Sequence, residues 1–177
     1  SFANFVKRNT DLGADDATHL PNSIFRTPAY IFEMDLARQS ISDPKPTDIF
    51  LGAVQGSPVI RQDTNGDGVN DWLEYTGGEH VVLGGTNNDD TIIGGEGDDT
   101  IWGDGGNDRL EGGYGIDSIK GGDGDDIITD SGTDAGAGEI HHGDGGNDVM
   151  NGGQGLDLLF GGTGNDFIFG GTDGKHI

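Results

Sequence analysis

The second half of this sequence is built on a nine-residue repeat, which limits the folds open to it more than any other feature. Glycine-rich units begin at Gly85 and recur every nine residues to Gly121, then resume at Gly143 and continue to Gly170. Within a unit, positions 1, 2 and 4 are mostly glycine, position 6 is aspartate and position 8 is a large aliphatic residue. A fixed short period indicates a repeat architecture, in which each unit packs against copies of itself.

The spacing of the aliphatic residues indicates how the units pack. The position-8 series is Ile92, Ile101, Leu110, Ile119, Ile128, Met150, Leu159, Ile168 and Ile177. One apolar residue in nine fits neither an amphipathic helix nor an alternating strand of ordinary length. It fits a solenoid in which a six-residue turn precedes a three-residue strand whose central side chain points inward. We therefore predict an all-β solenoid over residues 81–177, preceded by an irregular segment at 1–60 and a loop and linker at 61–80.

The glycines are expected to shape the turns. Glycine at positions 1, 2 and 4 permits positive φ values that residues with a Cβ resist. Asn88 takes the place of glycine in the first unit, and asparagine is the best tolerated substitute in that conformation.

The charge balance of the chain indicates its partners. Its 32 acidic and nine basic residues give a formal net charge of -23, and only 31% of its residues are apolar. Such a chain buries too little apolar surface to offset its conformational entropy without a further ingredient. Nucleic acid is excluded as a partner because phosphate binding needs clustered Lys and Arg, whereas divalent cations are suited to this charge.

Other features of the composition narrow the classes further. The chain has no cysteine, so it can form neither a disulfide framework nor a thiolate metal site. It has no apolar run long enough for a membrane span and no signal sequence at its N-terminus. The five histidines lack the spacing of a metal motif, and we interpret them as loop residues. A nucleophile elbow is also missing.

The position-6 aspartates predict ion sites. Two nonapeptides should make one full coil, so aspartates eighteen residues apart should stack along the same side. One side then carries Asp90, Asp108, Asp126, Asp148 and Asp166, and the other carries Asp99, Asp117 and Asp157. Hard oxygen ligands, namely these carboxylates and main-chain carbonyls of the glycine turns, select calcium. The carbonyl ligands that we predict are those of Gly95, Gly97, Gly113, Gly115, Gly122 and Gly124.

One stretch breaks the period. Residues 130–142, with the sequence DSGTDAGAGEIHH, take the place of one nonapeptide with four extra residues. Their small and polar composition predicts a bulged turn. We expect it to interrupt the ladder of cations on one side without ending the stack.

A second calcium motif lies upstream, in the sequence DTNGDGVNDWLE. The predicted ligands, at loop positions 1, 3, 5, 7, 9 and 12, are Asp63, Asn65, Asp67, the carbonyl of Val69, Asp71 and Glu74. Gly68 occupies the turning position 6, as in an EF-hand loop. The flanking residues do not predict long helices, so the loop is EF-hand-like, of the sort found in thrombospondin or dockerin repeats. The alternative is a solvated acidic turn.

The repeat units resemble the GGxGxDxUx repeat of RTX (repeats-in-toxin) proteins, and GGEGDDTIW, GGYGIDSIK, GGQGLDLLF and GGTGNDFIF fit it position by position. The resemblance implies a right-handed parallel β-roll that is disordered without calcium and folds when a secreted chain meets calcium outside the cell. It also implies export by the type I pathway. The sequence departs from the repeat at Lys175, where an aspartate is expected, and at residues 130–142.

The first thirty-three residues resemble the last segment of the animal-type haem peroxidase domain. The matching positions are Arg8, Asn9, Thr10, Leu20, Pro21 and Phe25. The resemblance implies a secreted peroxidase joined to an RTX stalk. The haem-ligating and catalytic histidines of that family lie upstream of this segment, so no catalytic role transfers to this fragment, and we do not expect it to be an enzyme.

The aromatic residues of the last units leave an alternative open. Leu158, Phe160, Phe167 and Phe169 occupy positions 7 and 9, which face outward. They are either covered by another part of the chain or form a surface for a partner. The function that we expect is that of a monomeric, calcium-binding module that supports export and stabilises its neighbouring domains. Its alternatives are part of a haem peroxidase and an adhesive solenoid.

Overall fold

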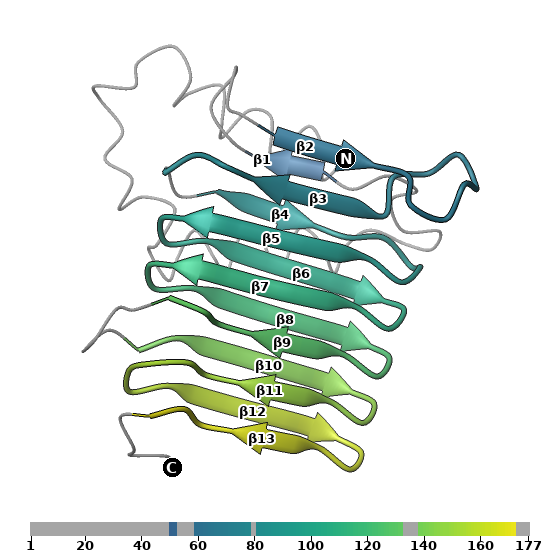
Figure 1. Ribbon diagram of the computed structural model, residues 1–177. Coiled ribbons are helices and arrows are strands. Elements are labelled where there is room, and N and C mark those ends of the chain that lie inside the picture. The colour runs from purple at the N-terminus through teal and green to yellow at the C-terminus, as the bar shows by residue number, and fades with distance from the viewer. Residues whose placement is uncertain (1–49, 53–58, 79–80, 133–137, 173–177) are drawn as a thin grey trace.

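The computed structural model describes residues 50–52, 59–78, 81–132 and 138–172. Every regular element in these ranges is a β-strand, and the strands form two facing sheets along a solenoid (Figure 1). This confirms the prediction of an all-β fold with a parallel β-roll. The segment that resembles a peroxidase, and Lys175, lie outside the described residues.

Each coil contributes one strand to each of the two sheets. In spatial order the six-stranded sheet contains β1 (Phe50–Gly52), β4 (Val82–Gly84), β6 (Thr100–Gly105), β8 (Ser118–Asp123), β10 (Ile140–Gly145) and β12 (Leu158–Thr163). The seven-stranded sheet contains β13 (Phe167–Phe169), β11 (Val149–Asn151), β9 (Ile127–Thr129), β7 (Arg109–Tyr114), β5 (Thr91–Glu96), β3 (Trp72–Tyr75) and β2 (Val59–Gln62).

The strand register confirms that two nonapeptides make one coil. Neighbouring strands within the roll are parallel, and Thr91 pairs with Arg109, eighteen residues later. The entrance differs, because β1 pairs with β4 and β2 pairs with β3 in antiparallel fashion. The hairpin of β2 and β3 joins the first full coil through the parallel pair of β3 and β5.

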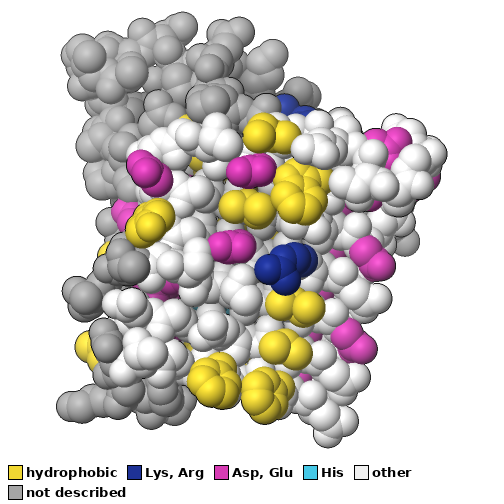
Figure 2. All heavy atoms as spheres, in the orientation of Figure 1, with side chains coloured by type: hydrophobic (Ala, Val, Ile, Leu, Met, Phe, Trp, Pro, Cys, Tyr) yellow, Lys and Arg dark blue, Asp and Glu magenta, His cyan; other side chains and the backbone are white. Residues whose placement is uncertain are grey.

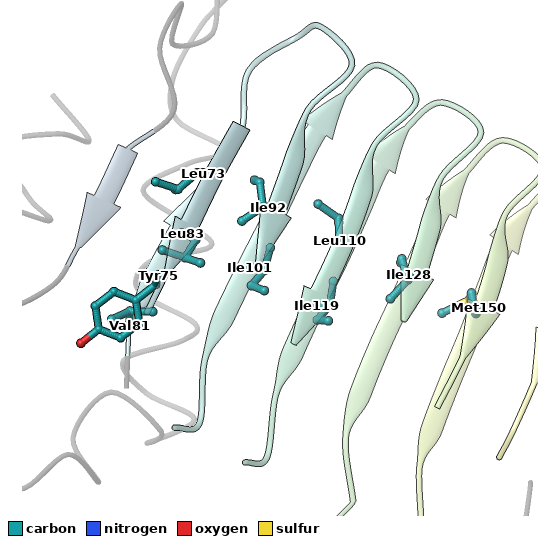
Figure 3. Packing of buried hydrophobic residues seen from close by; sticks show 10 residues of the cluster. All are labelled: Leu73, Tyr75, Val81, Leu83, Ile92, Ile101, Leu110, Ile119, Ile128 and Met150. Atoms are coloured by element: carbon teal, nitrogen blue, oxygen red, sulfur yellow. The ribbon is translucent and has the colours of Figure 1, made fainter. Parts of the chain in front are cut away.

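The core is a double row of position-8 side chains (Figure 3). One row, from the seven-stranded sheet, contains Leu73, Ile92, Leu110, Ile128 and Met150, each with no exposed surface. The other row, from the six-stranded sheet, begins with Leu83, Ile101 and Ile119, which are equally buried. A core of two apolar side chains per coil is thin for eighteen residues, so the turns must also contribute to stability.

The position-2 and position-4 glycines have the positive φ that the sequence predicted, and the position-1 glycines do not. Gly95 and Gly97, at positions 2 and 4 of one unit, have φ values of 99° and 112°. Gly94, at position 1, is needed for space, because a Cβ there would meet the Asp99 carboxylate and the carbonyl of Gly112. The expectation for Asn88 was wrong, since the described non-glycine residues with positive φ are Asp104 and Asp144, both at position 2.

The stack continues across the irregular stretch, as predicted. β10 begins at Ile140, within that stretch, and pairs in parallel with β8 on one side and β12 on the other. Its central inward residue is His141, which takes the place that Ile119 and Leu159 hold in the neighbouring strands. The four additional residues are therefore accommodated outside the strands. Equivalent residues of the two coils are 22 residues apart in the sequence here, as for Asp126 and Asp148, instead of the usual 18.

Acidic and hydrophobic side chains are mixed on the face seen in Figure 2. Acidic side chains line one turn edge and also lie on the sheet face, and hydrophobic side chains extend along the face to the end of the roll that holds β13. Phe160, Phe167 and Phe169 are 43%, 61% and 60% exposed. These positions face outward, as the sequence predicted.

Candidate metal centre

The position-6 aspartates are drawn into the roll by strand alternation. Positions 6 and 8 of a unit point to the same face, because successive side chains of a strand alternate. The aliphatic residue at position 8 faces the core, so the aspartate two residues earlier is also buried: Asp108 is 2% exposed and Asp99 is 1% exposed. A buried carboxylate is costly unless its charge is compensated.

One oxygen of each carboxylate links neighbouring coils on the first side. The backbone N–H of Asp90 donates to Oδ1 of Asp108 at 2.8 Å, and that of Asp108 donates to Asp126 at 2.9 Å. The N–H of Asp126 donates to Asp148 at 2.9 Å, and that of Asp148 donates to Asp166 at 3.1 Å. The five aspartates predicted to share this side therefore form one continuous ladder.

The second side begins in the same way. The N–H of Val81 donates to Oδ1 of Asp99 at 2.9 Å, and the N–H of Asp99 donates to Oδ1 of Asp117 at 2.7 Å. The sequence predicted that Asp99 and Asp117 would stack, and the register of β6 and β8 places them together.

The other oxygen has no hydrogen-bond donor. Oδ2 is buried and without a hydrogen bond in five of these aspartates: Asp99, Asp108, Asp117, Asp126 and Asp148. Asp90 reverses the pattern, because its Oδ2 accepts from the backbone and hydroxyl of Thr86 while its Oδ1 is left without a hydrogen bond. A regular row of buried carboxylate oxygens without donors is suited to binding cations.

Main-chain oxygen atoms lie beside these carboxylates. A Cβ built on Gly103 would contact both Oδ2 of Asp108 and the carbonyl oxygen of Gly121, which belongs to the next coil. The same pairing recurs at Gly94, where the two oxygens belong to Asp99 and Gly112. Carboxylate and carbonyl oxygens from successive coils form the hard donor set that calcium takes. The residues present therefore fit a calcium ion.

Burial also governs the protonation of these aspartates. Desolvation raises the pKa of Asp99 to about 9 and that of Asp108 to about 8, and the neighbouring carboxylates add to the shift. Desolvation likewise raises the pKa of Asp126 to about 7 and that of Asp90 to about 6. In the absence of a cation, the folded chain therefore holds several of these groups protonated at neutral pH.

The sequence prediction did not include the position-1 carbonyls. It named glycines at positions 2 and 4, whose carbonyl oxygens point at the equivalent glycine of the next coil. The carbonyl of Gly95 faces Gly113, and that of Gly97 faces Gly115. The carbonyls that lie beside a buried carboxylate oxygen belong to the position-1 glycines. Nothing in the sequence of a unit distinguishes the carbonyl at position 1 from those at positions 2 and 4.

Position 5 supplies a second ladder that the sequence analysis also missed. The N–H of Asn107 donates to the carboxylate of Asp89 at 2.7 Å, and the N–H of Asp125 donates to the side chain of Asn107 at 2.8 Å. The N–H of Asn147 then donates to Asp125 at 2.7 Å. The recurrence of Asp and Asn before the position-6 aspartate was the available signal.

The irregular coil has its own position-6 residue, Glu139. Ile140 pairs with both Ser118 and Leu158, so Glu139 lies level with Asp117 and Asp157. The sequence analysis missed this residue because the irregular turn changes the count of residues between coils, which conceals the equivalence. The interruption of the cation ladder at residues 130–142 stays a prediction.

The irregular coil contains a group of buried polar residues. Glu139 and His141 have no exposed surface, Asp130 is 3% exposed and Asp157 is 6% exposed. Desolvation, with Asp157 and Asp130 adding to it, raises the pKa of Glu139 to about 9. Desolvation lowers the pKa of His141 to about 4, so its imidazole is neutral.

The upstream loop connects β2 to β3 and has strands on both sides, not helices. Asp63 accepts from the N–H groups of Gly66 and Gly68 at 2.6 and 2.9 Å, which winds the loop around its first carboxylate. Asn65 accepts from the N–H of Asp67 at 2.9 Å, and Asp67 accepts from the N–H of Val69 at 2.8 Å. The predicted ligands at positions 1, 3 and 5 are thus oriented by consecutive tight turns.

The two later ligands of this loop are placed differently. Both carboxylate oxygens of Asp71 accept from Thr64, from its N–H at 2.7 Å and its hydroxyl at 2.9 Å, and these bonds lower the pKa of Asp71. Glu74 lies on β3, where it lines a hollow of about 390 Å³ together with Glu96 and Glu111. In the part of the chain that the structure describes, no three acidic or histidine side chains meet closely enough to hold a metal ion by themselves. Main-chain oxygens are therefore needed in any site.

The fold and these turns define the class, a β-roll whose coils are joined by carboxylate ladders suited to cations. The comparison with known families agrees: residues 84–113, 103–134 and 142–174 match the family model described as RTX calcium-binding nonapeptide repeat (4 copies). The matched residues and the solenoid together support an RTX β-roll, as the sequence predicted, and the family of this repeat is a non-catalytic calcium-binding module.

Further comparisons add nothing to this assignment. A search of curated proteins and a search of solved structures each returned no match to the chain. The described residues include no helix with the length and apolarity needed to cross a membrane.

Proposed function

We propose that this chain is a calcium-binding RTX module that folds when calcium binds outside the cell. The observation that supports it best is the row of buried aspartate oxygens without a hydrogen-bond donor along both turn edges. Three basic residues lie in the described ranges: Arg61 and Arg109 are exposed, and Lys120 is on an outward position of β8. The described residues therefore supply few positive charges to set against the ladders.

The chain's own residues prepare the sites. The N–H groups of one coil hold Oδ1 of the next, which orients Oδ2 toward the neighbouring carbonyl. Position-1 glycines leave the volume that a side chain would occupy. Bound calcium supplies positive charge and takes oxygen ligands from both coils. Because the unfolded chain does not bring these oxygens together, the free energy of binding also drives folding.

Circular dichroism of the chain with and without calcium tests this function. In EDTA we expect the spectrum of a coil, and on adding calcium the spectrum of a β-sheet, with no such change on adding magnesium. Magnesium is the matched control because it demands a tighter octahedral site. A sheet spectrum that persists in EDTA at neutral pH would contradict the proposal.

We also propose that the loop from Asp63 to Glu74 binds a further ion at the entrance of the roll. Its support is the winding of the loop by Asp63, Asn65 and Asp67, whose oxygens already face backbone N–H groups. Asp71 would exchange its bonds with Thr64 for the ion. Glu74 would have to reach the loop from β3.

The wider role of the module is part of the proposal. RTX repeats are typical of secreted bacterial proteins, and the match to this family supports a secreted parent protein. Type I export, stabilisation of an attached domain and a monomeric state follow from the same analogy. A parent with haem peroxidase activity rests on the resemblance of residues 1–33 alone.

A second candidate function is partner binding at the end of the roll. Phe160, Phe167 and Phe169 are exposed, and Ile168, a position-8 residue, is 45% exposed at the edge strand β13. Exposed apolar residues grouped at one end are typical of an interaction surface. This function is compatible with calcium-dependent folding.

A further inference from the structure

The irregular coil offers a site outside the regular repeats. Hydrogen bonds fix its register: the N–H of Ile140 donates to the carbonyl of Asp117 at 3.0 Å, and the N–H of Leu158 donates to the carbonyl of Glu139 at 2.8 Å. Regular coils make the same bond, as between Ser118 and Asp99 at 2.9 Å. Glu139 is therefore a true position-6 residue, although it falls between the segments that match the repeat family.

The carboxylates here differ from those of the regular ladders. Both carboxylate oxygens of Glu139, and both of Asp157, are buried without a donor from any other residue. The two carboxylates lie close enough to hydrogen-bond each other when one of them is protonated. In the regular ladders one oxygen of each buried aspartate accepts a backbone N–H. This coil thus concentrates more orphaned oxygen atoms than any regular coil in the described ranges.

A second observation comes from His141. It is fully buried, neither ring nitrogen has a hydrogen-bond partner, and it replaces the aliphatic residue of the position-8 row. Because positions 6 and 8 share a face, its ring and the Glu139 side chain point into the same interior. The charge of Asp157 also acts on this ring. A polar side chain so placed in an otherwise aliphatic row indicates that the interior is polar at this level.

We propose that Glu139 and Asp157 bind one calcium ion across the irregular coil, so that the second ladder continues where the repeat sequence is broken. The inference rests on the calcium-binding function proposed above. Among the described residues, no three acidic or histidine side chains come together. The ion would therefore have two carboxylates as side-chain ligands, and carbonyl oxygens or water would complete its coordination shell. Such an all-oxygen shell favours calcium over zinc.

Calcium stoichiometry of the full chain, measured by equilibrium dialysis, tests this proposal. We expect Glu139→Gln to bind one ion fewer than the wild type, and Glu139→Asp, which restores the residue type of the repeats, to keep the full number. Glu96→Gln is the matched control, because it removes the same charge from an exposed position and should bind as many ions as the wild type. The double variant of Glu139→Gln and Asp157→Asn should lose no more ions than Glu139→Gln alone.

The possible outcomes separate the two proposals. Full stoichiometry in Glu139→Gln would overturn the site at Glu139 and leave the calcium-binding function standing, whereas a wild type that binds no calcium would end both. If Glu139→Gln does not fold, Asp157→Asn alone should show the loss of one ion, and its full stoichiometry would overturn the site. Zinc bound in place of calcium, and lost in His141→Leu, would also overturn it.

Discussion

Replacing one buried ladder aspartate should have opposite effects on stability with and without calcium. Asp108 is the best position, because its Oδ1 accepts the N–H of Asp90 at 2.8 Å while its Oδ2 has no hydrogen bond. Asparagine keeps the shape and the Oδ1 acceptor but removes the charge. In calcium, the variant loses a ligand, so the calcium concentration at the folding midpoint should rise by about tenfold or more.

Without calcium, the same change should stabilise the fold at neutral pH. The pKa of Asp108 rises from 3.8 to about 8 on folding, mainly by desolvation. Its stabilising contribution is complete below pH 3.8 and is lost as the pH rises toward 8. The loss is about 1.4 kcal/mol per pH unit, or roughly 4 kcal/mol at pH 7. Asp108→Asn removes this penalty, but burying the asparagine amide costs about 1–3 kcal/mol. The variant should therefore be more stable than the wild type at pH 7 by roughly 1–3 kcal/mol.

Urea unfolding followed by circular dichroism, from pH 4 to pH 8, measures this effect. An osmolyte populates the folded state in EDTA. The wild type should lose stability with rising pH more steeply than Asp108→Asn. The advantage of the variant should therefore shrink as the pH falls and reverse near pH 4, where only the cost of the buried amide remains. Asp123→Asn is the control, because its carboxylate is exposed. Equal destabilisation of Asp108→Asn in EDTA and in calcium would refute the argument.

Two further predictions concern the turns and the exposed end. Gly115→Ala should destabilise the calcium-bound fold by several kcal/mol, because its φ is 125° and a Cβ would collide with the Gly97 carbonyl. Gly68→Ala, at φ 92° with open space around it, should cost only about 1–2 kcal/mol. Equal unfolding midpoints for the two variants would contradict the steric reason. Replacing Phe160, Phe167 and Phe169 by Ser should abolish any self-association or partner binding seen by analytical ultracentrifugation and leave calcium-induced folding intact, and association that persists would exclude this surface.

Much of the fold follows from the sequence because the repeat is local. Each nonapeptide contains its own turn, inward aspartate and core residue, so the spacing alone predicts the coil length and the partners in each row. Asp90 and Asp108 stack as predicted, as do Ile92 and Leu110. The EF-hand-like loop is a local motif in the same sense, since the turns at Asp63, Asn65 and Asp67 span few residues.

Other features depend on contacts between coils, which the sequence does not record. The division of most ladder carboxylates into a bonded Oδ1 and an orphaned Oδ2 arises only when a second coil lies alongside. Glu139 and His141 illustrate this best. Their places are set by the pairing of β10 with β8 and β12, and a turn of irregular length separates them from their equivalents in the sequence. Register across such a turn is a property of the stacked coils, because hydrogen bonds between strands align residues whatever the length of chain that connects them.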